Sequence, residues 1–311
     1  MDVRAAVGAL PREPGVYRFR DARGRAMYAG RAVDLRRRVG SYWRDLGDRP
    51  HLARMVRAVA RIEAVVCDSE HEAAWLERNV LEHRMPPANR VPGGLETPVH
   101  IRLDSSAATP GLKVVHLPTP RRDTAWFGPY LGGQRARTTV AALHRAFPLH
   151  YTGAALTVAE REMARARGVG PERRDELVGA VRAVLDRDPA AVAALRAELV
   201  RRRQAASDEA AYELAGRIQG ELEALEWTVA PQRVTVATAY DLDVSGWHEG
   251  TLVSFTIRGG RMRDWRQRAC SARAAQQHLD ATPPPWREFA GRNAVLAATL
   301  AAHAGRPARG S

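Results

Sequence analysis

The sequence predicts an α/β protein whose first 97 residues form a compact domain with the element order β-β-α-α-β-α. Two observations support this order: two short runs of alternating β-branched and aromatic residues near the N-terminus, and three later segments whose apolar residues recur at helical spacing. A chain of 311 residues has room for two or three compact domains with buried cores. We expect an α/β domain, a mixed α+β middle, a helical segment and a small β-rich C-terminal segment, at residues 1–97, 98–150, 151–230 and 231–311.

The α/β domain opens with a predicted β-hairpin. Residues 15–19 alternate β-branched and aromatic side chains after two prolines, residues 21–24 form a turn, and residues 26–30 return as the second strand. Tyr17 and Tyr28 therefore lie in one hairpin. Tyrosines at such positions usually serve packing, so their presence alone does not identify a site.

Helices and a third strand follow the hairpin. Asp34 is the predicted N-cap of the first helix, a second helix covers about residues 52–59, and a strand covers residues 62–66. Arg38 and Tyr42 are four residues apart on the first helix, so they share one of its faces. The hairpin and this helix together supply tyrosine and arginine side chains to one small domain.

The third predicted helix carries the most informative acid of the chain. Ser69 and Glu72 have the spacing of a capping box, and the helix runs from there to about Arg84, before two prolines. At about 100° per residue, Glu77 lies near the centre of an apolar stripe formed by Ala73, Leu76, Val80 and Leu81. An inward carboxylate is costly without a cation or metal partner. Either Glu77 has such a partner, or this helix is partly exposed and Glu77 is solvated.

Further elements are predicted beyond a linker at Pro92-Gly93-Gly94. They are strands at residues 99–103 and 113–117, a helix at 138–147, a long helical stretch at 157–226, and strands at 233–244 and 251–262. Gly259-Gly260 is a predicted turn within the last of these segments. Two short helices are expected to close the chain.

The charge of the chain predicts an anionic partner. The net charge is +13 and the pI is about 10.8, and Lys113 is the one lysine among 48 basic residues. Codon bias explains arginine in place of lysine, but it does not explain the excess of positive charge. Residues 1–97, 98–150 and 231–311 each carry five more basic than acidic residues, whereas residues 151–230 carry two fewer. We expect the three basic segments to face nucleic-acid phosphates and the acidic one to dock a protein.

Several classes of protein are excluded or disfavoured by composition. No run of residues is long and apolar enough for a transmembrane helix, so no membrane partner is expected. The N-terminus lacks an apolar signal core, and we expect a cytoplasmic protein. Cys67 and Cys270 are too few for a zinc cage, an iron–sulfur cluster or a disulfide framework.

The N-terminal domain contains a set of side chains suited to phosphodiester hydrolysis. Glu77 has the oxygen ligands that a hard divalent cation prefers, Arg31 and Arg38 can stabilise phosphate charge, and Tyr17 or Tyr28 can relay a proton. Spacing alone does not separate this set from ordinary packing and surface residues.

Four ordered blocks in the first 90 residues resemble the GIY-YIG nuclease domain in the form found at the N-terminus of the UvrC family. They are Leu10–Tyr17, Met27–Ala32, Asp34–Tyr42, and Ser69–Glu77 with Asn89. Trp126–Tyr130 resembles a further UvrC segment. Ala211–Leu222, within a helix at about residues 205–226, resembles the UVR motif that docks on UvrB. The resemblance is close to residue 150 and looser after it.

The resemblance implies roles for seven residues. Tyr28 would accept the proton of the attacking water, Arg38 would stabilise the phosphate, and Glu77 would bind one Mg²⁺ or Mn²⁺. The others would position the scissile phosphate: Tyr17, Arg31, Tyr42 and Asn89. It also implies damaged or distorted double-stranded DNA as substrate, UvrB as a partner of the UVR-like helix, and one incision on the 3′ side of a lesion.

Departures from the family pattern leave alternatives open. Ala29 replaces the central isoleucine of the YIG element, Arg31 stands where lysine is usual, and Gln219-Gly220 replaces an Arg-Asp pair in the UVR-like helix. The family's cysteine cluster is absent, so no iron–sulfur cluster is expected. The ribonuclease-H-like second nuclease and helix-hairpin-helix part of UvrC are also absent from the 311 residues. The alternatives are a stand-alone structure-specific GIY-YIG nuclease independent of UvrB, or a non-catalytic DNA- or UvrB-binding paralogue.

Overall fold

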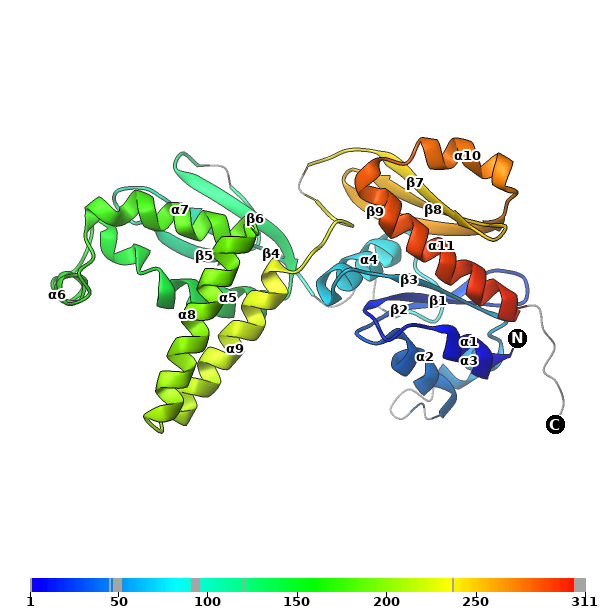
Figure 1. Cartoon of the computed structure of the whole chain (residues 1–311), viewed down its shortest axis with the longest axis horizontal. Coiled ribbons are helices and arrows are strands. Elements are labelled where there is room, and N and C mark those ends of the chain that lie inside the picture. The colour runs from blue at the N-terminus through cyan, green and yellow to red at the C-terminus, as the bar shows by residue number, and fades with distance from the viewer. Residues whose placement is uncertain are drawn as a thin grey trace. The chain divides into compact units, whose positions relative to one another are not determined.

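The computed structural model describes residues 2–44, 46, 52–90, 96–119, 121–236 and 238–304. The chain divides into two compact units: Met1–Leu95 together with Pro231–Ser311, and Glu96–Ala230. The first unit is therefore built from both ends of the chain, drawn from blue to cyan and from yellow to red in Figure 1. The predicted Pro92-Gly93-Gly94 linker lies outside the described residues.

The N-terminal part of the first unit contains an antiparallel sheet with the strand order β2-β1-β3. Its elements are α1 (Val3–Ala9), β1 (Gly15–Arg20), β2 (Ala26–Ala32), α2 (Leu35–Arg44), α3 (Ala53–Arg57), β3 (Arg61–Val66) and α4 (Glu70–His83). The predicted β-β-α-α-β-α order is confirmed. The seven-residue helix α1 precedes it and was not predicted, since a helix this short has little periodicity to detect.

Side-chain caps fix the starts of the helices that carry the site. The Asp34 carboxylate accepts the Arg37 backbone N–H at 2.8 Å, as an N-cap does. The Ser69 hydroxyl accepts the Glu72 N–H at 3.0 Å, and the Glu72 carboxylate accepts the N–H of Asp68 at 2.6 Å. The capping box at α4 thus reaches one residue further back than its usual form.

The C-terminal part of the first unit forms a second antiparallel sheet, in the order β7-β8-β9, followed by two helices. The elements are β7 (Leu242–His248), β8 (Thr251–Arg258), β9 (Arg261–Ala269), α10 (Ala272–Asp280) and α11 (Pro284–Ala304). Gly259 and Gly260 form the predicted turn, with φ of +58° and +71°. The strand β9 was not predicted, because Met262 and Trp265 are the buried apolar residues of an otherwise polar run. The last helix has 21 residues and is not short.

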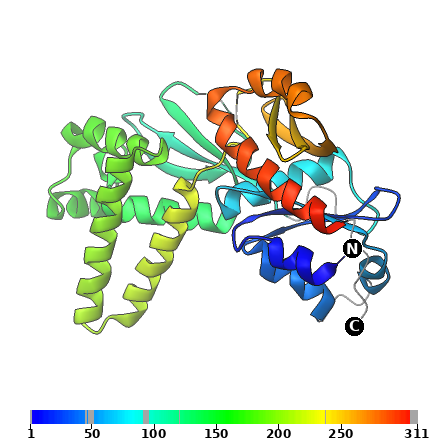
Figure 2. The same ribbon diagram turned by 45° about the vertical axis from the view of Figure 1, so that its right-hand side comes forward.

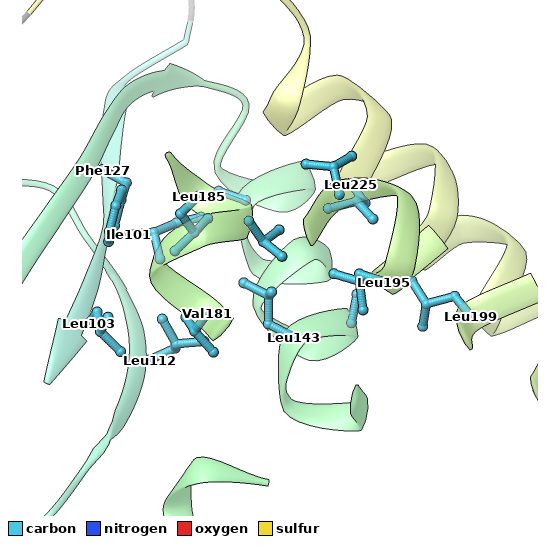
Figure 3. Packing of buried hydrophobic residues seen from close by; sticks show 14 of the residues in the cluster. Ile101, Leu103, Leu112, Phe127, Leu143, Val181, Leu185, Leu195, Leu199 and Leu225 are labelled. Carbon is cyan, nitrogen blue, oxygen red and sulfur yellow. The ribbon is translucent and has the colours of Figure 1, made fainter. Parts of the chain in front are cut away.

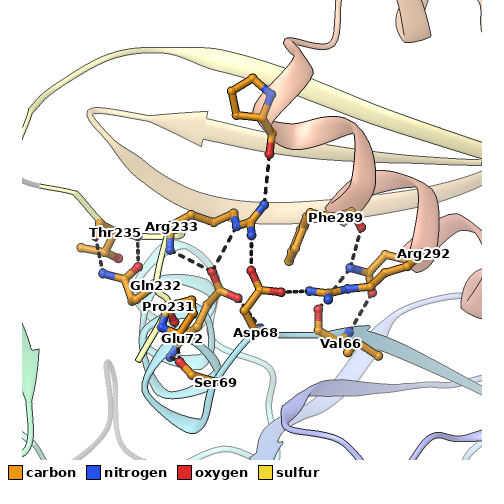
Figure 4. Close-up of polar contacts among 12 residues, drawn as sticks. Val66, Asp68, Ser69, Glu72, Pro231, Gln232, Arg233, Thr235, Phe289 and Arg292 are labelled. Atoms are coloured by element: carbon orange, nitrogen blue, oxygen red, sulfur yellow. Dashed lines mark hydrogen bonds and ion pairs between the residues drawn. The ribbon is translucent and has the colours of Figure 1, made fainter. Parts of the chain in front are cut away.

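Buried polar contacts join the two parts of the first unit (Figure 4). Asn293 of α11 is fully buried; its side chain accepts the Val66 N–H at 2.7 Å and donates to the Val66 carbonyl at 3.1 Å. Asp68 forms ion pairs with both Arg233 and Arg292. Helix α11 packs against β3 as well as β7 and β8. The predicted first and fourth segments therefore share one compact unit.

The second unit combines a sheet with the order β5-β4-β6 and a set of helices. Its elements are β4 (Pro98–Asp104), β5 (Gly111–Val115), β6 (Thr124–Leu131), α5 (Gly133–Ala146), η2 (Leu149–Thr152), α6 (Val158–Ala166), η3 (Pro171–Arg173), α7 (Arg174–Leu185), α8 (Pro189–Asp208) and α9 (Tyr212–Val229). Apolar side chains from the sheet and from α5, α7, α8 and α9 form its core (Figure 3). Helices α8 and α9 pack side by side (Figure 2), and the UVR-like segment covers the end of α8 and most of α9.

No helix in the part of the chain that the structure describes combines the length and apolarity needed to span a bilayer. Both cysteines are free and buried.

Candidate active site

Three predicted tyrosines meet on one face of the sheet β2-β1-β3. Tyr17 of β1 lies opposite Gly30 in the register of the hairpin, so its ring lies diagonally beside Tyr28 of β2. Tyr42 of α2 completes the cluster: the three ring centroids are 5.9 to 6.2 Å apart, and the hydroxyls of Tyr17 and Tyr42 are 2.7 Å apart. Tyr17 and Tyr42 are buried, whereas Tyr28 is half-buried. Tyr28 is therefore the tyrosine of this cluster that a substrate can reach.

Gly30 makes room for this cluster. A Cβ atom at this position would lie 2.6 Å from the Tyr17 hydroxyl oxygen and 3.0 Å from a ring carbon of Tyr28. Such distances are far shorter than van der Waals contact, so no larger residue fits without moving a tyrosine. Steric exclusion of a side chain therefore explains why glycine closes the Tyr28-Ala29-Gly30 motif.

Burial and charge set the ionisation of the tyrosines. Burial raises the pKa of Tyr17 well above its ordinary value, and the nearby Tyr42 raises it further. The pKa of Tyr28 is raised for the same two reasons, burial first. The Arg38 guanidinium, 5.6 Å from the centroid of the Tyr42 ring, opposes both shifts. The phenols of Tyr17 and Tyr28 therefore hold their protons at neutral pH, and Arg38 is the charge that favours a phenolate.

Glu77 has the cation partner that its position on α4 calls for. Its Oε1 accepts the Arg31 backbone N–H at 3.2 Å, and its Oε2 lies 3.4 Å from the Arg31 Nε. Its negative charge also raises the pKa of Tyr28, so the carboxylate lies near the tyrosine cluster. The stripe residues Ala73, Leu76, Val80 and Leu81 are buried as predicted. The Glu77 side chain is 22% exposed, so it lies at the edge of that stripe and not at its buried centre.

Asn89 pairs with the backbone of the edge strand β2. Its side-chain oxygen accepts the Ala29 N–H at 3.0 Å, and its side-chain nitrogen donates to the Ala29 carbonyl at 2.8 Å. The Ala88 N–H also donates to the Met27 carbonyl at 3.0 Å. The segment after α4 therefore holds both sides of Tyr28 in place. The structure thus gathers all seven predicted residues around β2, with Asn89 in a positioning contact.

The carboxylate of Glu77 fits a partly hydrated divalent cation. Among the described residues, no three His, Cys, Asp or Glu side chains come together as a metal cage. Glu77 would then supply a single carboxylate. Mg²⁺ is commonly bound through one or two carboxylates and keeps several of its waters, so this donor set suits it.

Sequence reasoning missed the charged residues on the opposite face of the same sheet. Glu63 of β3 is fully buried and pairs with Arg18, Arg20 and Arg61. Arg18 also contacts Asp264 of β9 at 2.7 Å. Strand alternation was a usable signal, because Arg18 and Arg20 alternate with Tyr17 and Phe19 along β1. Nothing local in the sequence indicates the partner on β9.

Glu72 was also missed as a buried acid. It was predicted only as a helix cap, yet it is fully buried and accepts the Arg233 backbone N–H at 2.8 Å (Figure 4). Burial raises the pKa of Glu72, while its hydrogen bonds to the backbone of Asp68 and Arg233 oppose that shift. Its role is to hold the start of the C-terminal part against α4.

The fold and this cluster define the class of protein: residues 13–90 match the family of UvrC-like GIY-YIG domains. The "UvrABC system protein C" of Mycobacterium sp. (strain KMS) is 32% identical over 280 residues, covering 85% of this chain and 41% of that protein. The same protein of Geobacter metallireducens is 33% identical over 279 residues, covering 83% and 44%. The chain therefore carries a UvrC-like GIY-YIG domain and is a homologue of UvrC over most of its own length. It spans about two fifths of the length of these curated relatives.

A solved structure also matches the N-terminal part. It is the GIY-YIG N-terminal endonuclease domain of UvrC from Thermotoga maritima, described as bound to its catalytic divalent cation, magnesium. The sequence identity is 31%, the match covers 28% of this chain and 96% of that chain, and the TM-score is 0.26.

Proposed function

We propose that the chain is a metal-dependent DNA endonuclease that makes a single incision, on the 3′ side, near DNA lesions in the cytoplasm. The observation that supports this most directly is the meeting of Tyr17, Tyr28, Tyr42 and Arg38 with the Glu77–Arg31 pair inside a UvrC-like domain. These are the side chains that phosphodiester hydrolysis needs, and they come from four separate elements, β1, β2, α2 and α4.

In this proposal Glu77 holds one Mg²⁺ or Mn²⁺, as the magnesium described for the Thermotoga domain suggests. When bound, such an ion would neutralise charge on the scissile phosphate. Arg31, through its backbone N–H and guanidinium, orients the Glu77 carboxylate. No iron–sulfur cluster is part of the proposal.

In this mechanism the half-buried Tyr28 first releases its own phenolic proton to solvent, and the resulting phenolate takes the proton of the attacking water. Burial and Tyr42 oppose its ionisation, and the Arg38 charge favours it, so Arg38 serves both the phenolate and the phosphate. The Tyr17 and Tyr42 hydroxyls, bonded to each other, hold the ring positions. Asn89 keeps β2, and with it Tyr28, in register.

We propose a single incision because these 311 residues offer one candidate nuclease site. After residue 244 the acids are few and separate in the sequence: Glu249, Asp264, Asp280 and Glu288. A second, two-metal nuclease would need several clustered carboxylates. The 3′ side is proposed from the family resemblance.

The UVR-like helix is the proposed contact for UvrB. On α9, Tyr212 is 71% exposed and Leu214 is 37% exposed, both large apolar side chains. A pull-down with UvrB, compared between the wild type and Tyr212→Asp, tests this part. Retained nuclease activity without UvrB binding would favour the stand-alone nuclease.

Strand cleavage is the decisive test of the function. A duplex with one defined lesion, labelled on the damaged strand, is incubated with the full chain and Mg²⁺ or Mn²⁺, with Glu77→Ala as the control. One metal-dependent nick 3′ to the lesion is expected. Release of a short oligonucleotide by this chain would contradict the one-site proposal, and no cleavage with retained DNA binding would favour the non-catalytic paralogue.

A further inference from the structure

A cleft in the first unit has a high concentration of arginine. It has a volume of about 890 Å³ and is lined by the β1–β2 hairpin, the start of β3, the end of α4 and the strand β9. Nine of its twenty lining residues are arginines, and two are aspartates. The C-terminal part of the unit supplies three of these arginines, so the cleft exists only where the two ends of the chain pack together.

Part of this charge is fixed by internal partners. Glu63 pairs with Arg18, Arg20 and Arg61, and Glu82 lies 3.9 Å from Arg263. Even when these two glutamates are added to the two lining aspartates, nine arginines face four carboxylates. The cleft therefore keeps an excess of five positive charges. Held guanidiniums form a preorganised wall, because their side chains lose little further freedom when an anion binds.

Other arginines of the cleft are available to a ligand. The side chains of Arg23, Arg84 and Arg266 are exposed and, within the described ranges, have no carboxylate or hydrogen-bond partner. Two buried donors of the lining, Arg61 Nε and Gln267 Nε2, also lack a hydrogen-bond acceptor in the described part of the chain. Free donors beside a positive wall suit a ligand with several anionic oxygens.

The position of the cleft connects it to the tyrosine cluster. Met27, which lines the cleft, directly precedes Tyr28, and Pro86 and Pro87 of the lining lie just before Asn89. The cleft includes Arg18, Arg20 and Asp264 of the face opposite the tyrosine cluster, and the two come together at the edge strand β2, where Met27 and Tyr28 are consecutive. A strand of DNA with its scissile phosphate at Tyr28 would reach the cleft by passing around this edge. An acidic peptide bound in the cleft would gain no affinity from the nearby tyrosine cluster.

We propose that this arginine cleft binds the phosphate backbone of DNA, as a second contact beyond the scissile phosphate. The inference rests on the proposed nuclease function and names how the substrate is held. Each phosphate that Arg23, Arg84 or Arg266 neutralises releases a counterion, so the cleft adds affinity that weakens steeply with salt.

Binding measurements on the full chain test the cleft without requiring cleavage. The anisotropy of a fluorescent duplex, and separately of a single strand of the same sequence, is followed without divalent metal at several salt concentrations. The wild type is compared with the triple variant Arg23→Ala/Arg84→Ala/Arg266→Ala. The control triple, Arg57→Ala/Arg182→Ala/Arg273→Ala, removes the same charge from exposed arginines on three helices outside the cleft. The melting temperature of each variant verifies its fold.

The cleft variant should bind at least about tenfold more weakly at low salt, and its slope of log affinity against log salt should fall by roughly 2 to 3, at about 0.9 per lost duplex phosphate contact. A loss on the duplex or on the single strand supports the proposal and identifies which form enters the cleft. Equal binding by the wild type and the cleft variant, or an equal loss in the control triple, would overturn it. So would weaker poly-glutamate binding by the cleft variant with unchanged DNA binding, which would assign the cleft to an acidic protein.

Failure of the cleft and failure of the function are distinguishable. If the wild type nicks DNA and the cleft variant binds DNA as tightly as the wild type, only the cleft proposal is overturned. If the chain binds DNA through the cleft but does not cleave it, only the proposed nuclease function is overturned. If the wild type binds neither the duplex nor the single strand, both the cleft proposal and the nuclease function are overturned.

Discussion

The two faces of the sheet β2-β1-β3 are built on opposite principles. One face carries aromatic rings, with Tyr17 and Phe19 of β1 packed beside Tyr28. The other face carries charge, with Arg18 of β1 between Glu63 and Asp264. A single strand supplies both faces because its side chains alternate. The difference teaches that the candidate catalytic tyrosines gather on the aromatic face, while the charged face fastens the sheet to the C-terminal part.

Replacing the proposed metal ligand, Glu77, should have the largest effect, and this effect should be on the cleavage rate alone. Glu77→Gln should lower cleavage by about 1,000-fold or more, because the charge that holds the cation is lost. DNA affinity and melting temperature should stay close to wild type. Glu249→Gln, the same change at a side chain 81% exposed, is the control. Substantial cleavage by Glu77→Gln would remove the metal role from this residue.

A substitution on the charged face should lower the free energy of unfolding and leave the chemistry of the cleavage step unchanged. Glu63→Gln leaves Arg18, Arg20 and Arg61 without their buried carboxylate, which should cost about 3 kcal/mol of unfolding free energy. Urea denaturation measures this loss. The exposed Asp243–Arg258 pair offers a control, since Asp243→Asn should cost under about 1 kcal/mol. A Glu63→Gln protein as stable as the wild type would show that the charged face does not fasten the sheet.

Removing single hydroxyls separates chemistry from packing within the tyrosine cluster. Tyr28→Phe should slow cleavage by about 100-fold without lowering the melting temperature, since general-base loss has at least this size and the ring remains. Tyr17→Phe should also slow cleavage, but it should destabilise the fold by about 1 kcal/mol, because it removes a buried hydrogen bond to Tyr42. Single-turnover rates and thermal melts measure both. If both variants cleave like the wild type, the hairpin tyrosines serve packing only.

A smaller effect is expected from crowding the aromatic face. Gly30→Ala places a methyl group against the Tyr17 hydroxyl, which should cost about 1 to 3 kcal/mol and reduce cleavage by displacing the rings. Gly216→Ala on α9 is the matched control, because nothing lies within 4 Å of its Cβ and alanine favours a helix. A Gly30→Ala protein with unchanged rate and stability would mean that the cluster tolerates a wider spacing than the structure shows.

The aromatic face could be predicted from sequence because its residues lie in short motifs on regular elements. Strand alternation, the N-cap at Asp34 and helical spacing around Glu77 each act over a few residues, and the structure follows them closely. Arg18 and Asp264 are 246 positions apart, and no periodicity connects them. Asn293 is a partial exception, since a lone asparagine in the apolar helix α11 signals a buried polar partner, although not Val66 itself. Local rules therefore predicted the elements that carry the candidate site, and the family resemblance supplied its seven residues. Neither predicted the contacts that fasten the sheet to the C-terminal part.

Asn89 also bears on how the protein behaves at high concentration. An edge strand presents unpaired backbone groups that can template pairing with a second chain. By hydrogen bonding to both backbone groups of Ala29, the Asn89 amide acts as a one-residue substitute for a neighbouring strand. The edge beside the tyrosine cluster is thereby protected against intermolecular β-pairing. The asparagine that closes the motif thus guards this part of the chain against aggregation as well as holding Tyr28.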